Sequence, residues 1–532
     1  MSDAVSAMLP QRAPIVIDFD AAVGAPLTLV VAAGKLSPST GRRGWSTVDN
    51  AHGFRLDAGH VARFAEVSGD HNPLHVDAAF AGRGPFGRTI VHGALSAIAV
   101  LAAVPPAAVR DASGLTVRFT RPVLPGTDYR VLVRQAGSTL EATAVEGDLP
   151  AVTMTLSPGT GLAAAPPPAD GGSPGRCEAP DFADHVPGWQ EAGDYALPSV
   201  TGLLALAEEL GCRAAPPTVL AALAWGSWFA GMRRPGRDCL LSGLRLRPGA
   251  SRTGYQARVR GADPRTGALV TDAELPGLTL ELRAFQRLPV AAPTWASATA
   301  YRPADDALAG ERALVVGGSR GLGAAVTAAL AARSATVWAG QRDGATEVAA
   351  LADEFGGRVR ALRLDAADAD QSTLRAAELD LTGLVLCAGP AVRPVRLHPD
   401  TVPAVRDFVD RSLAMVLNPL TAVLDRIRPG GWLVVVSSSA VEDFPAHWPH
   451  YAAAKAAVEA LGEHCARVHG LRVLVVRPPR LRTDMAAGPL GVADAVDPGL
   501  VAARIAGWVP GADLGVTIMG SAELTQSPAA TA

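Results

Sequence analysis

One strand–turn–helix–strand pattern near residue 320 constrains the fold of this chain more than any other feature. Residues 313–340 read ALVVGGSRGLGAAVTAALAARSATVWAG, which is an apolar run, a glycine-rich turn, an Ala-rich helical stretch and a second apolar run. This order predicts the opening of a doubly wound α/β domain, in which helices bury both faces of a parallel sheet. At 532 residues the chain is too long for one hydrophobic core, so further domains are expected.

Two segments rich in Pro, Ala and Gly divide the rest of the chain. We interpret them as linkers, because Pro and Gly interrupt regular elements. The expected organisation is a first domain at residues 1–157, a linker at 158–187, a second domain at 188–288, a linker at 289–309, the α/β domain at 310–520 and a frayed tail at 521–532.

The first two domains read as diverged copies of one unit. Aligning Ser113 with Ser242 places SGLTVRF on SGLRLRP, and the apolar run from Val91 then falls without a gap on the run from Leu220. Both runs are apolar on nearly every face, which predicts a helix wrapped by a sheet, and alternating segments after each run predict antiparallel strands. The expected fold is therefore multidomain, with tandem α+β hot-dog folds followed by an α/β Rossmann domain. Chance similarity between two Ala-rich segments is the alternative to a tandem.

The composition excludes several classes of protein. Hydrophobic residues make up 48% of the chain and charged residues 19%, as in ordinary globular proteins. A formal net charge of -3 gives no reason to expect nucleic acid as a partner. The five cysteines lack the spacing of a zinc site or a disulfide framework, so no metal is expected. The chain has no signal-like start and no run of about 18 apolar residues, which predicts a cytoplasmic protein without a membrane partner.

A polar motif in the first domain carries chemistry. Residues 64–79 read FAEVSGDHNPLHVDAA, and this resembles the signature of MaoC-like, type 2 enoyl thioester hydratases, which is Gly-Asp, one free position, Asn-Pro, an aliphatic residue and His. The resemblance continues with IVHG at 90–93 and VRFTRPVLPGTDY at 117–129. The matching residues of the signature are Gly69, Asp70, Asn72, Pro73, Leu74 and His75.

Hydration of a double bond beside a thioester needs a base and an acid, and a carboxylate with an imidazole can act as both. The resemblance implies that Asp70 and His75 are the catalytic pair and that Asn72 orients them. It also implies that the N–H of Gly93, at the start of the buried helix, stabilises the oxyanion. His92 is expected only to cap that helix. The second domain has LLALAEELG in place of the motif, so its expected role is structural.

A second group of motifs lies in the α/β domain. Glycines at 317, 321 and 323 have a spacing that lets a dinucleotide pyrophosphate reach a helix N-terminus. With SSS at 437–439 and YAAAK at 451–455, the domain resembles the short-chain dehydrogenase/reductase superfamily. The resemblance implies that Tyr451 donates a proton to a nascent alkoxide, that Lys455 assists it, and that Ser438 positions the carbonyl. Lys455 is one of only two lysines in the chain, so its place in the motif is improbable by chance.

The cofactor expected is NADP(H), because the guanidinium groups of Arg320 and Arg342 favour a 2′-phosphate. Asp343 keeps NAD(H) possible. The residues expected to bind the cofactor are Gly317, Ser319, Arg320, Gly321, Leu322, Gly323, Arg342, Asp365, Ala388, Gly389, Tyr451, Lys455 and Thr483. Three departures from the family pattern put the proton relay and the nicotinamide loop in question: Cys387 replaces an Asn, Ser412 a helix Asn, and Pro479 a Gly.

The two motifs predict activities that share an intermediate. A reductase makes a 3-hydroxyacyl thioester from a 3-oxoacyl thioester, and a dehydratase of this family converts the (R)-hydroxy compound to a 2-enoyl thioester. The sequence therefore predicts a bifunctional reductase and dehydratase of fatty acid or polyketide type, acting on an acyl carrier protein or coenzyme A thioester, and assembled as a homo-oligomer. One alternative is the reverse, β-oxidation direction with NAD. Another is an acyl-binding protein in which a site has decayed.

Overall fold

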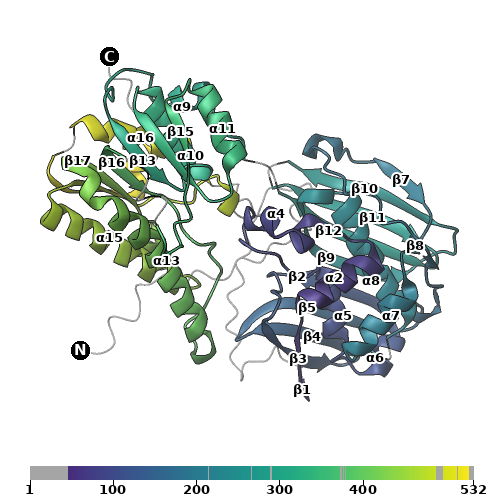
Figure 1. The fold of residues 1–532 in the computed structure, drawn as a ribbon. Coiled ribbons are helices and arrows are strands. Elements are labelled where there is room, and N and C mark those ends of the chain that lie inside the picture. The colour runs from purple at the N-terminus through teal and green to yellow at the C-terminus, as the bar shows by residue number, and fades with distance from the viewer. Residues whose placement is uncertain are drawn as a thin grey trace. The chain divides into compact units, whose positions relative to one another are not determined.

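The computed structural model describes residues 46–526, except residues 214, 265, 288–289, 372–373, 375–376, 378, 487–494 and 512. These residues form two compact units, shown in Figure 1. The first contains the described residues up to Ala81 and from Thr89 to residue 287, and the second contains Gly82–Arg88 and the described residues from 290 onward. In the described part of the chain, every helix is too short or too polar to cross a membrane.

The first unit is built on a ten-stranded antiparallel sheet, ordered β1-β3-β4-β5-β2-β9-β12-β11-β10-β7. Each half of the sheet has the same strand order. From the edge to the centre come the first, third, fourth, fifth and second of its strands along the chain, so β2 and β9 pair at the centre. This symmetry agrees with the predicted tandem repeat. The strands are β1 (Ser46–Arg55), β2 (Ala112–Phe119), β3 (Asp128–Ala136), β4 (Thr139–Glu146), β5 (Leu149–Pro158), β7 (Gln190–Gly193), β9 (Cys239–Pro248), β10 (Tyr255–Asp263), β11 (Ala268–Leu275) and β12 (Leu278–Gln286).

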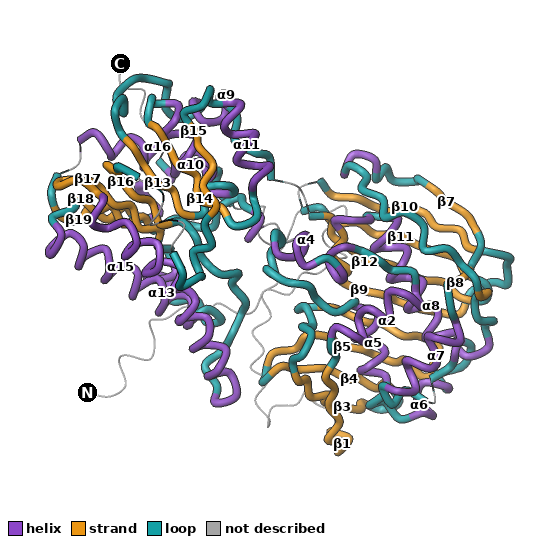
Figure 2. The backbone as a smooth tube through the Cα atoms, viewed as in Figure 1, coloured by secondary structure: helices purple, strands orange, loops and turns teal. Residues whose placement is uncertain are grey.

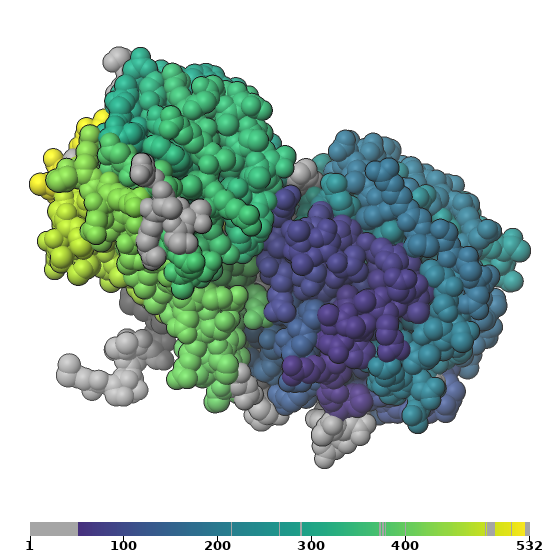
Figure 3. All heavy atoms as spheres, in the orientation of Figure 1, coloured from purple at the N-terminus to yellow at the C-terminus, as the bar shows by residue number. Residues whose placement is uncertain are grey.

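Two central helices, α5 (Gly93–Leu101) and α8 (Pro217–Trp228), pack against this sheet and against each other, as Figure 2 shows. Residues Ala94 to Leu101 of α5 are all buried, which is the outcome that a run apolar on every face predicts. In Figure 3 the early residues of this unit, in purple, and its later residues, in blue and teal, form one continuous surface. The other helices are α2 (Ala58–Ser68), α3 (Pro73–Val76), α4 (Ala78–Gly82), α6 (Pro106–Arg110) and α7 (Val200–Glu209).

The segment 158–187, predicted as a linker, packs on the first unit. Leu162 is fully buried, and the short strand β6 (Ala169–Asp170) pairs with β8 (Ala196–Leu197). The indole N–H of Trp228 donates to the carbonyl of Pro174 over 3.0 Å. This connection is therefore an ordered part of the unit.

The second unit holds a seven-stranded parallel sheet, ordered β15-β14-β13-β16-β17-β18-β19. The order reverses between β13 and β16, and a ligand crevice forms at such a switch point, outside the carboxyl ends of the strands. The strands are β13 (Arg312–Val316), β14 (Thr336–Gln341), β15 (Val359–Arg363), β16 (Leu381–Leu386), β17 (Ile427–Val436), β18 (Arg472–Val476) and β19 (Gly515–Met519).

Helices cover both faces of this sheet, as a doubly wound domain requires. One face carries α9 (Trp295–Thr299), α10 (Gly321–Ala332), α11 (Ala345–Glu354), α16 (Pro498–Trp508) and α17 (Ser521–Thr525), and the other carries α13 (Val402–Val423) and α15 (Pro449–His469). Helix α9 lies within the predicted linker 289–309. Helix α17 occupies the start of the predicted tail and buries Leu524, so these residues are part of the fold rather than frayed. Residues 527–532 of that tail lie outside the described residues.

Candidate active sites

Local backbone signals shape the polar motif of the first unit. Gly69 ends α2 in the left-handed conformation, with φ of 76°, which a residue without a Cβ adopts at least cost. Asn72 then caps α3, since its side chain accepts from the N–H of Leu74 over 2.9 Å, and Pro73 is the first helical residue. The resulting turn brings Asp70 and His75 to one place.

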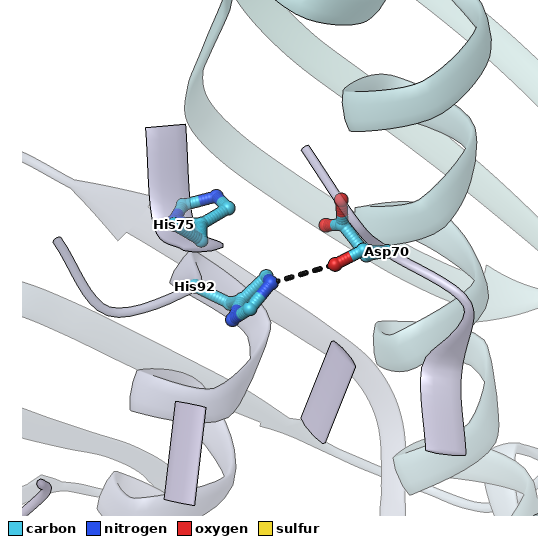
Figure 4. A group of neighbouring side chains, drawn as sticks. All are labelled: Asp70, His75 and His92. Atoms are coloured by element: carbon cyan, nitrogen blue, oxygen red, sulfur yellow. Dashed lines mark hydrogen bonds between the residues drawn. The ribbon is translucent and has the colours of Figure 1, made fainter. Parts of the chain in front are cut away.

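The buried Asp70 and His92 and the partly buried His75 form a cluster, drawn in Figure 4. One ligand-type atom from each lies within 4.8 Å of the other two, and the His75 and His92 ring centroids are 3.9 Å apart. His75 Nδ1 lies 2.9 Å from the carbonyl oxygen of Ile90, so it donates there and leaves a lone pair on Nε2. Burial lowers the pKa of His75 to about 3, so its imidazole is neutral at neutral pH.

Asp70 is only 1% exposed. Burial raises the pKa of its carboxyl, and this effect is opposed by the nearby His75 and by hydrogen bonds to the carboxylate. Oδ1 accepts from the N–H of Asn72 over 3.2 Å, and Oδ2 accepts from the hydroxyl of Ser227 over 2.7 Å. A buried carboxylate and a neutral imidazole nitrogen this close can both bind one water molecule.

His92 does not have the role expected from the sequence. Its side chain makes no capping hydrogen bond to α5. Instead, Nε2 lies 2.9 Å from the backbone carbonyl oxygen of Asp70 and donates to it, and burial lowers the pKa of His92 to about 3. The expectation of a helix cap is wrong, because the ring points across the motif and fixes the backbone of Asp70. These residue types also ligate zinc; the Nε2 of His92 is engaged in this bond, whereas its Nδ1 has no hydrogen-bond partner among the described residues.

The second half of the unit contributes to this site, which the sequence analysis missed. Ser227 belongs to α8 and donates to Asp70. The side-chain amide of Asn72 donates to the carbonyls of Gly231 over 2.7 Å and Gly236 over 3.1 Å, so Asn72 ties the motif to the second half. A Cβ on Gly231 would lie 2.5 Å from Asp70 Oδ1, so only glycine fits there. A serine near the end of a mainly apolar helix was the available signal for Ser227.

Gly93 is the first residue of α5, as expected. Its N–H makes no hydrogen bond to any residue that the structure describes, which leaves it available to a ligand. A Cβ on Gly93 would lie 3.1 Å from the ring of Phe119, so a side chain would crowd the start of the helix.

Replacing Ser227 with Ala is expected to lower kcat for enoyl thioester hydration about tenfold, the effect of losing one hydrogen bond to a charged group. The hydroxyl stabilises the ionised carboxylate, so its loss raises the pKa of Asp70 further. A base that must be ionised then needs a higher pH, and the acid limb of the kcat/KM profile moves upward.

The matched control is Ser96→Ala, because Ser96 is also buried in a central helix but donates to the carbonyl of His92 over 3.0 Å. Rate measurements across pH would count against the role of Ser227 if both variants had the same profile.

The predicted reductase residues lie at the carboxyl end of the second unit's sheet. Ser438 follows β17, while Tyr451 and Lys455 lie on the first turns of α15. Lys455 Nζ donates to the carbonyl of Val436 over 2.8 Å and lies 5.8 Å from the centroid of the Tyr451 ring. The strand end therefore fixes the ammonium beside the tyrosine. The Ser438 hydroxyl oxygen accepts from the N–H of Ala440 over 3.2 Å.

The glycine-rich turn has little room for side chains. Gly317 and Gly321 have φ values of 80° and 55°, and a Cβ on Gly323 would lie 2.0 Å from the carbonyl oxygen of Gly317. Ala388 lies against Gly317, and Thr483 against Gly321. Three segments distant in sequence therefore meet at the start of α10, whose free N–H groups suit a pyrophosphate.

The other expected cofactor residues have varied surroundings. Ser319 lies beside Gly344, the residue before α11, Leu322 is buried, and Gly389 faces open space. Asp365 Oδ1 accepts from the N–H of Ala367 over 3.0 Å, so this acid shapes its own turn. Arg342 pairs with Asp343 over 2.6 Å.

Of the three departures from the family pattern, Pro479 lies half-buried in the loop after β18, and the other two have defined surroundings. The Ser412 hydroxyl donates to the carbonyl of Phe408 in its own helix over 2.7 Å. Asn418 donates to the carbonyls of residues 366–368, so it holds a loop. Burial raises the pKa of the Cys387 thiol to about 11, which keeps it protonated at neutral pH. Arg320 lies 3.5 Å from a carboxylate oxygen of Asp484, beside Thr483.

Comparison with known families supports both assignments. Residues 42–153 match the MaoC like domain, and residues 311–489 match the short chain dehydrogenase family. The (R)-specific enoyl-CoA hydratase of Aeromonas caviae is 38% identical over 104 residues, which are 19% of this chain and 72% of that protein. The chain belongs to the MaoC-like dehydratase family through its first domain, and it carries a short-chain dehydrogenase domain after it.

Two further relatives match over shorter parts. The 3-hydroxybutyryl-CoA dehydratase of Methylorubrum extorquens is 37% identical over 84 residues, which are 15% of this chain and 54% of that protein. The 3-hydroxyacyl-thioester dehydratase X of Mycobacterium tuberculosis is 41% identical over 71 residues, or 13% of this chain and 25% of that protein. The chain thus spans about half and a quarter of the lengths of these two relatives.

Several solved structures are similar to part of this chain. A short chain dehydrogenase from Burkholderia cenocepacia in complex with NADP is 27% identical, with 40% of this chain and 97% of that chain covered and a TM-score of 0.35. The 3-oxoacyl-[acyl-carrier protein] reductase from Brucella melitensis is 23% identical, with 45% and 98% covered and a TM-score of 0.36.

Proposed function

We propose that this protein reduces 3-oxoacyl thioesters with NADPH and dehydrates the resulting (R)-3-hydroxyacyl thioesters. The observation that carries the proposal is the presence, in one chain, of the neighbouring Asp70 and His75 and of Ser438, Tyr451 and Lys455 at a sheet's carboxyl edge. The product of the second set is the substrate of the first. This chemical continuity favours a bifunctional enzyme over an acyl-binding protein.

The dehydratase step uses proton acceptors that lie close together. In the hydration direction, a water molecule between Asp70 and His75 loses a proton to one of them as its oxygen bonds to C3 of the enoyl thioester. The electron pair of the double bond moves toward the thioester oxygen, where the free N–H of Gly93 can stabilise the charge. A proton then returns from the base to C2. Dehydration is the reverse of these steps.

The reductase step depends on a bound nicotinamide cofactor, which supplies the hydride. The glycine turn fits its pyrophosphate, because Gly323 and Gly317 are in contact and leave no room for side chains. Ser438 hydrogen-bonds the substrate carbonyl oxygen, and Tyr451 gives its proton to that oxygen as it becomes an alkoxide. The ammonium of Lys455 stabilises the tyrosinate that remains.

The preference for NADPH rests on Arg342. Replacing Arg342 with Ser is expected to raise KM for NADPH about tenfold and to leave KM for NADH within about twofold, because only NADPH carries a phosphate for the guanidinium to bind. Asp343 pairs with this guanidinium over 2.6 Å, so the phosphate must compete with that carboxylate.

Initial rates with both cofactors measure this preference. Arg360→Ser is the control, since Arg360 lies on β15, over the ring of Trp338. A parent enzyme that uses NADH better than NADPH would instead favour the oxidative, β-oxidation direction.

A coupled assay tests the whole proposal. The protein is mixed with 3-oxobutyryl-CoA and NADPH, nicotinamide absorbance is followed, and the products are identified by mass spectrometry. Oxidation of NADPH with formation of crotonyl-CoA supports both activities. Hydration of crotonyl-CoA without any NADPH oxidation would reduce the second unit to a cofactor-binding or structural role.

A further inference from the structure

Two neighbouring arginines after α8 differ in their partners. The π-helical turn η3 (Phe229–Arg233) ends with Arg233, whose guanidinium pairs with Glu178 and, over 2.9 Å, with Glu191. Arg234 has no ion pair with any residue that the structure describes, and its Nε and Nη1 are buried without an acceptor. Its guanidinium carbon lies 4.5 Å from the centroid of the Trp189 ring. A cation that is partly withdrawn from water and unpaired is costly, so an anion is expected beside it.

A buried histidine lies near this guanidinium. His185 is 2% exposed, and its Nδ1 has no hydrogen-bond partner among the described residues. Its Nε2 donates to the side-chain oxygen of Gln286 over 2.6 Å, because the amide of Gln286 itself donates to the carbonyl of Pro180. The positive charge of Arg234 acts on this imidazole. The Asp184 carboxylate also acts on it, but accepts from the N–H of Asp181 over 3.0 Å.

The position of Arg234 links it to the dehydratase site. Asn72 binds the carbonyls of Gly231 and Gly236, so its amide holds both ends of the turn that contains Arg234. Gly231 lies against Asp70. Three residues span at most about 10 Å, so the backbone of Arg234 is close to the catalytic loop. The adjoining segment reaches the surface, where Val186 is 59% exposed.

We propose that Arg234 binds a phosphate of the carrier that holds the acyl thioester. The inference rests on the proposed function, because it assumes a thioester substrate at Asp70 and His75. Coenzyme A and acyl carrier proteins both present the thioester on a phosphopantetheine arm, so both place a phosphate beyond the reacting carbons. A planar guanidinium binds two phosphate oxygens at once, and the Trp189 ring holds it in a fixed orientation.

Three crotonyl thioesters test this assignment: those of coenzyme A, of 4′-phosphopantetheine and of pantetheine, which lacks phosphate. For Arg234→Gln we expect KM for crotonyl-CoA to rise about tenfold with kcat unchanged, and both constants for crotonyl-pantetheine to stay the same. If KM also rises for the phosphopantetheine thioester, Arg234 binds the phosphate of the arm, which coenzyme A and carrier proteins share. If KM rises for crotonyl-CoA alone, Arg234 binds the nucleotide phosphates.

Two further variants separate charge from structure. Arg233→Gln removes a neighbouring but paired guanidinium, so it should affect all three thioesters equally. Arg234→Lys keeps the charge and should raise KM for crotonyl-CoA no more than about threefold. The proposal is overturned if Arg234→Gln affects crotonyl-pantetheine as much as crotonyl-CoA, or leaves crotonyl-CoA unchanged.

A binding measurement keeps the site separate from the catalytic proposal. If the parent protein hydrates none of the three thioesters, the proposed dehydratase function fails. Calorimetric titration with coenzyme A then still tests the phosphate site. A Kd at least about tenfold weaker for Arg234→Gln than for Arg233→Gln supports it, and equal values overturn it.

Discussion

Replacing Asp70 with Asn is expected to lower kcat for crotonyl-CoA hydration about a thousandfold, within the range for loss of a general acid–base group. The amide has nearly the same shape as the carboxylate, and its single oxygen can keep the hydrogen bond from Ser227 while the bond from the N–H of Asn72 is lost, so the fold should be retained. It cannot take a proton from water, whereas the neutral His75 remains in place. Absorbance at the enoyl thioester band measures the rate in either direction.

The coupled reaction gives this variant a second, qualitative readout. With 3-oxobutyryl-CoA and NADPH, Asp70→Asn should oxidise the nicotinamide at the parent rate and accumulate the 3-hydroxy compound. Asp77→Asn is the control, because Asp77 lies in the same loop and its side chain accepts from the N–H groups of Ala79 and Phe80, which an Asn side chain can also do. Equal hydration rates for the two variants would remove Asp70 from the mechanism.

Short, contiguous sequence patterns predicted part of the fold and part of each candidate site. Asp70 and His75 lie within one turn and cap, so their spacing alone brings them together. The glycine turn and the Tyr451–Lys455 pair are local in the same sense, since side chains four residues apart share a helix face. The alignment of the two apolar runs likewise anticipated the symmetric ten-stranded sheet, because burial on all faces of two equivalent helices requires two equivalent half-sheets.

Contacts between distant segments could not be predicted in this way. Ser227 and Asp70 are separated by 157 positions, and in the alignment of the two copies Ser227 falls opposite Ile98, so no symmetry marks it. The role of His92 depends on the direction of its ring, which is set by packing against Phe64 and His75 rather than by its place before a helix. Both residues act on Asp70 through the tertiary fold.

The same reasoning applies to the second unit's departures from its family pattern. A serine in a helix often donates to the carbonyl four residues earlier, and Ser412 does so to Phe408. Its hydroxyl is thereby engaged in the helix. Lys455 lies beside Tyr451, held by the carbonyl of Val436, without any contact to Ser412 that an Asn would have to supply.

Replacing Tyr451 with Phe is expected to lower the rate of NADPH oxidation about a thousandfold, because the alkoxide formed from the 3-oxo group loses its proton donor. The ring contacts of Tyr451 with Trp448 and Phe408, at centroid distances of 5.9 and 6.2 Å, remain in the variant, so its stability should change little. Hydration of crotonyl-CoA should be unaffected, since the first unit holds Asp70 and His75. Stopped reduction with retained hydration would therefore separate the two activities within one chain.

NADPH serves both for a control of Tyr451→Phe and for a test of whether the reductase site has decayed. Tyr301→Phe removes a hydroxyl that donates to Asp497 over 3.1 Å, and it should leave NADPH oxidation unchanged. Nicotinamide fluorescence should show that Tyr451→Phe still binds NADPH, because the glycine turn at Gly317 to Gly323 is intact. If the parent protein also binds NADPH but never oxidises it, the second unit is a binding module whose proton relay has been lost. If the parent protein oxidises NADPH and only Tyr451→Phe binds it without oxidising it, the tyrosine hydroxyl is the proton donor. The roles proposed for Ser438 and Lys455 then depend on that hydroxyl.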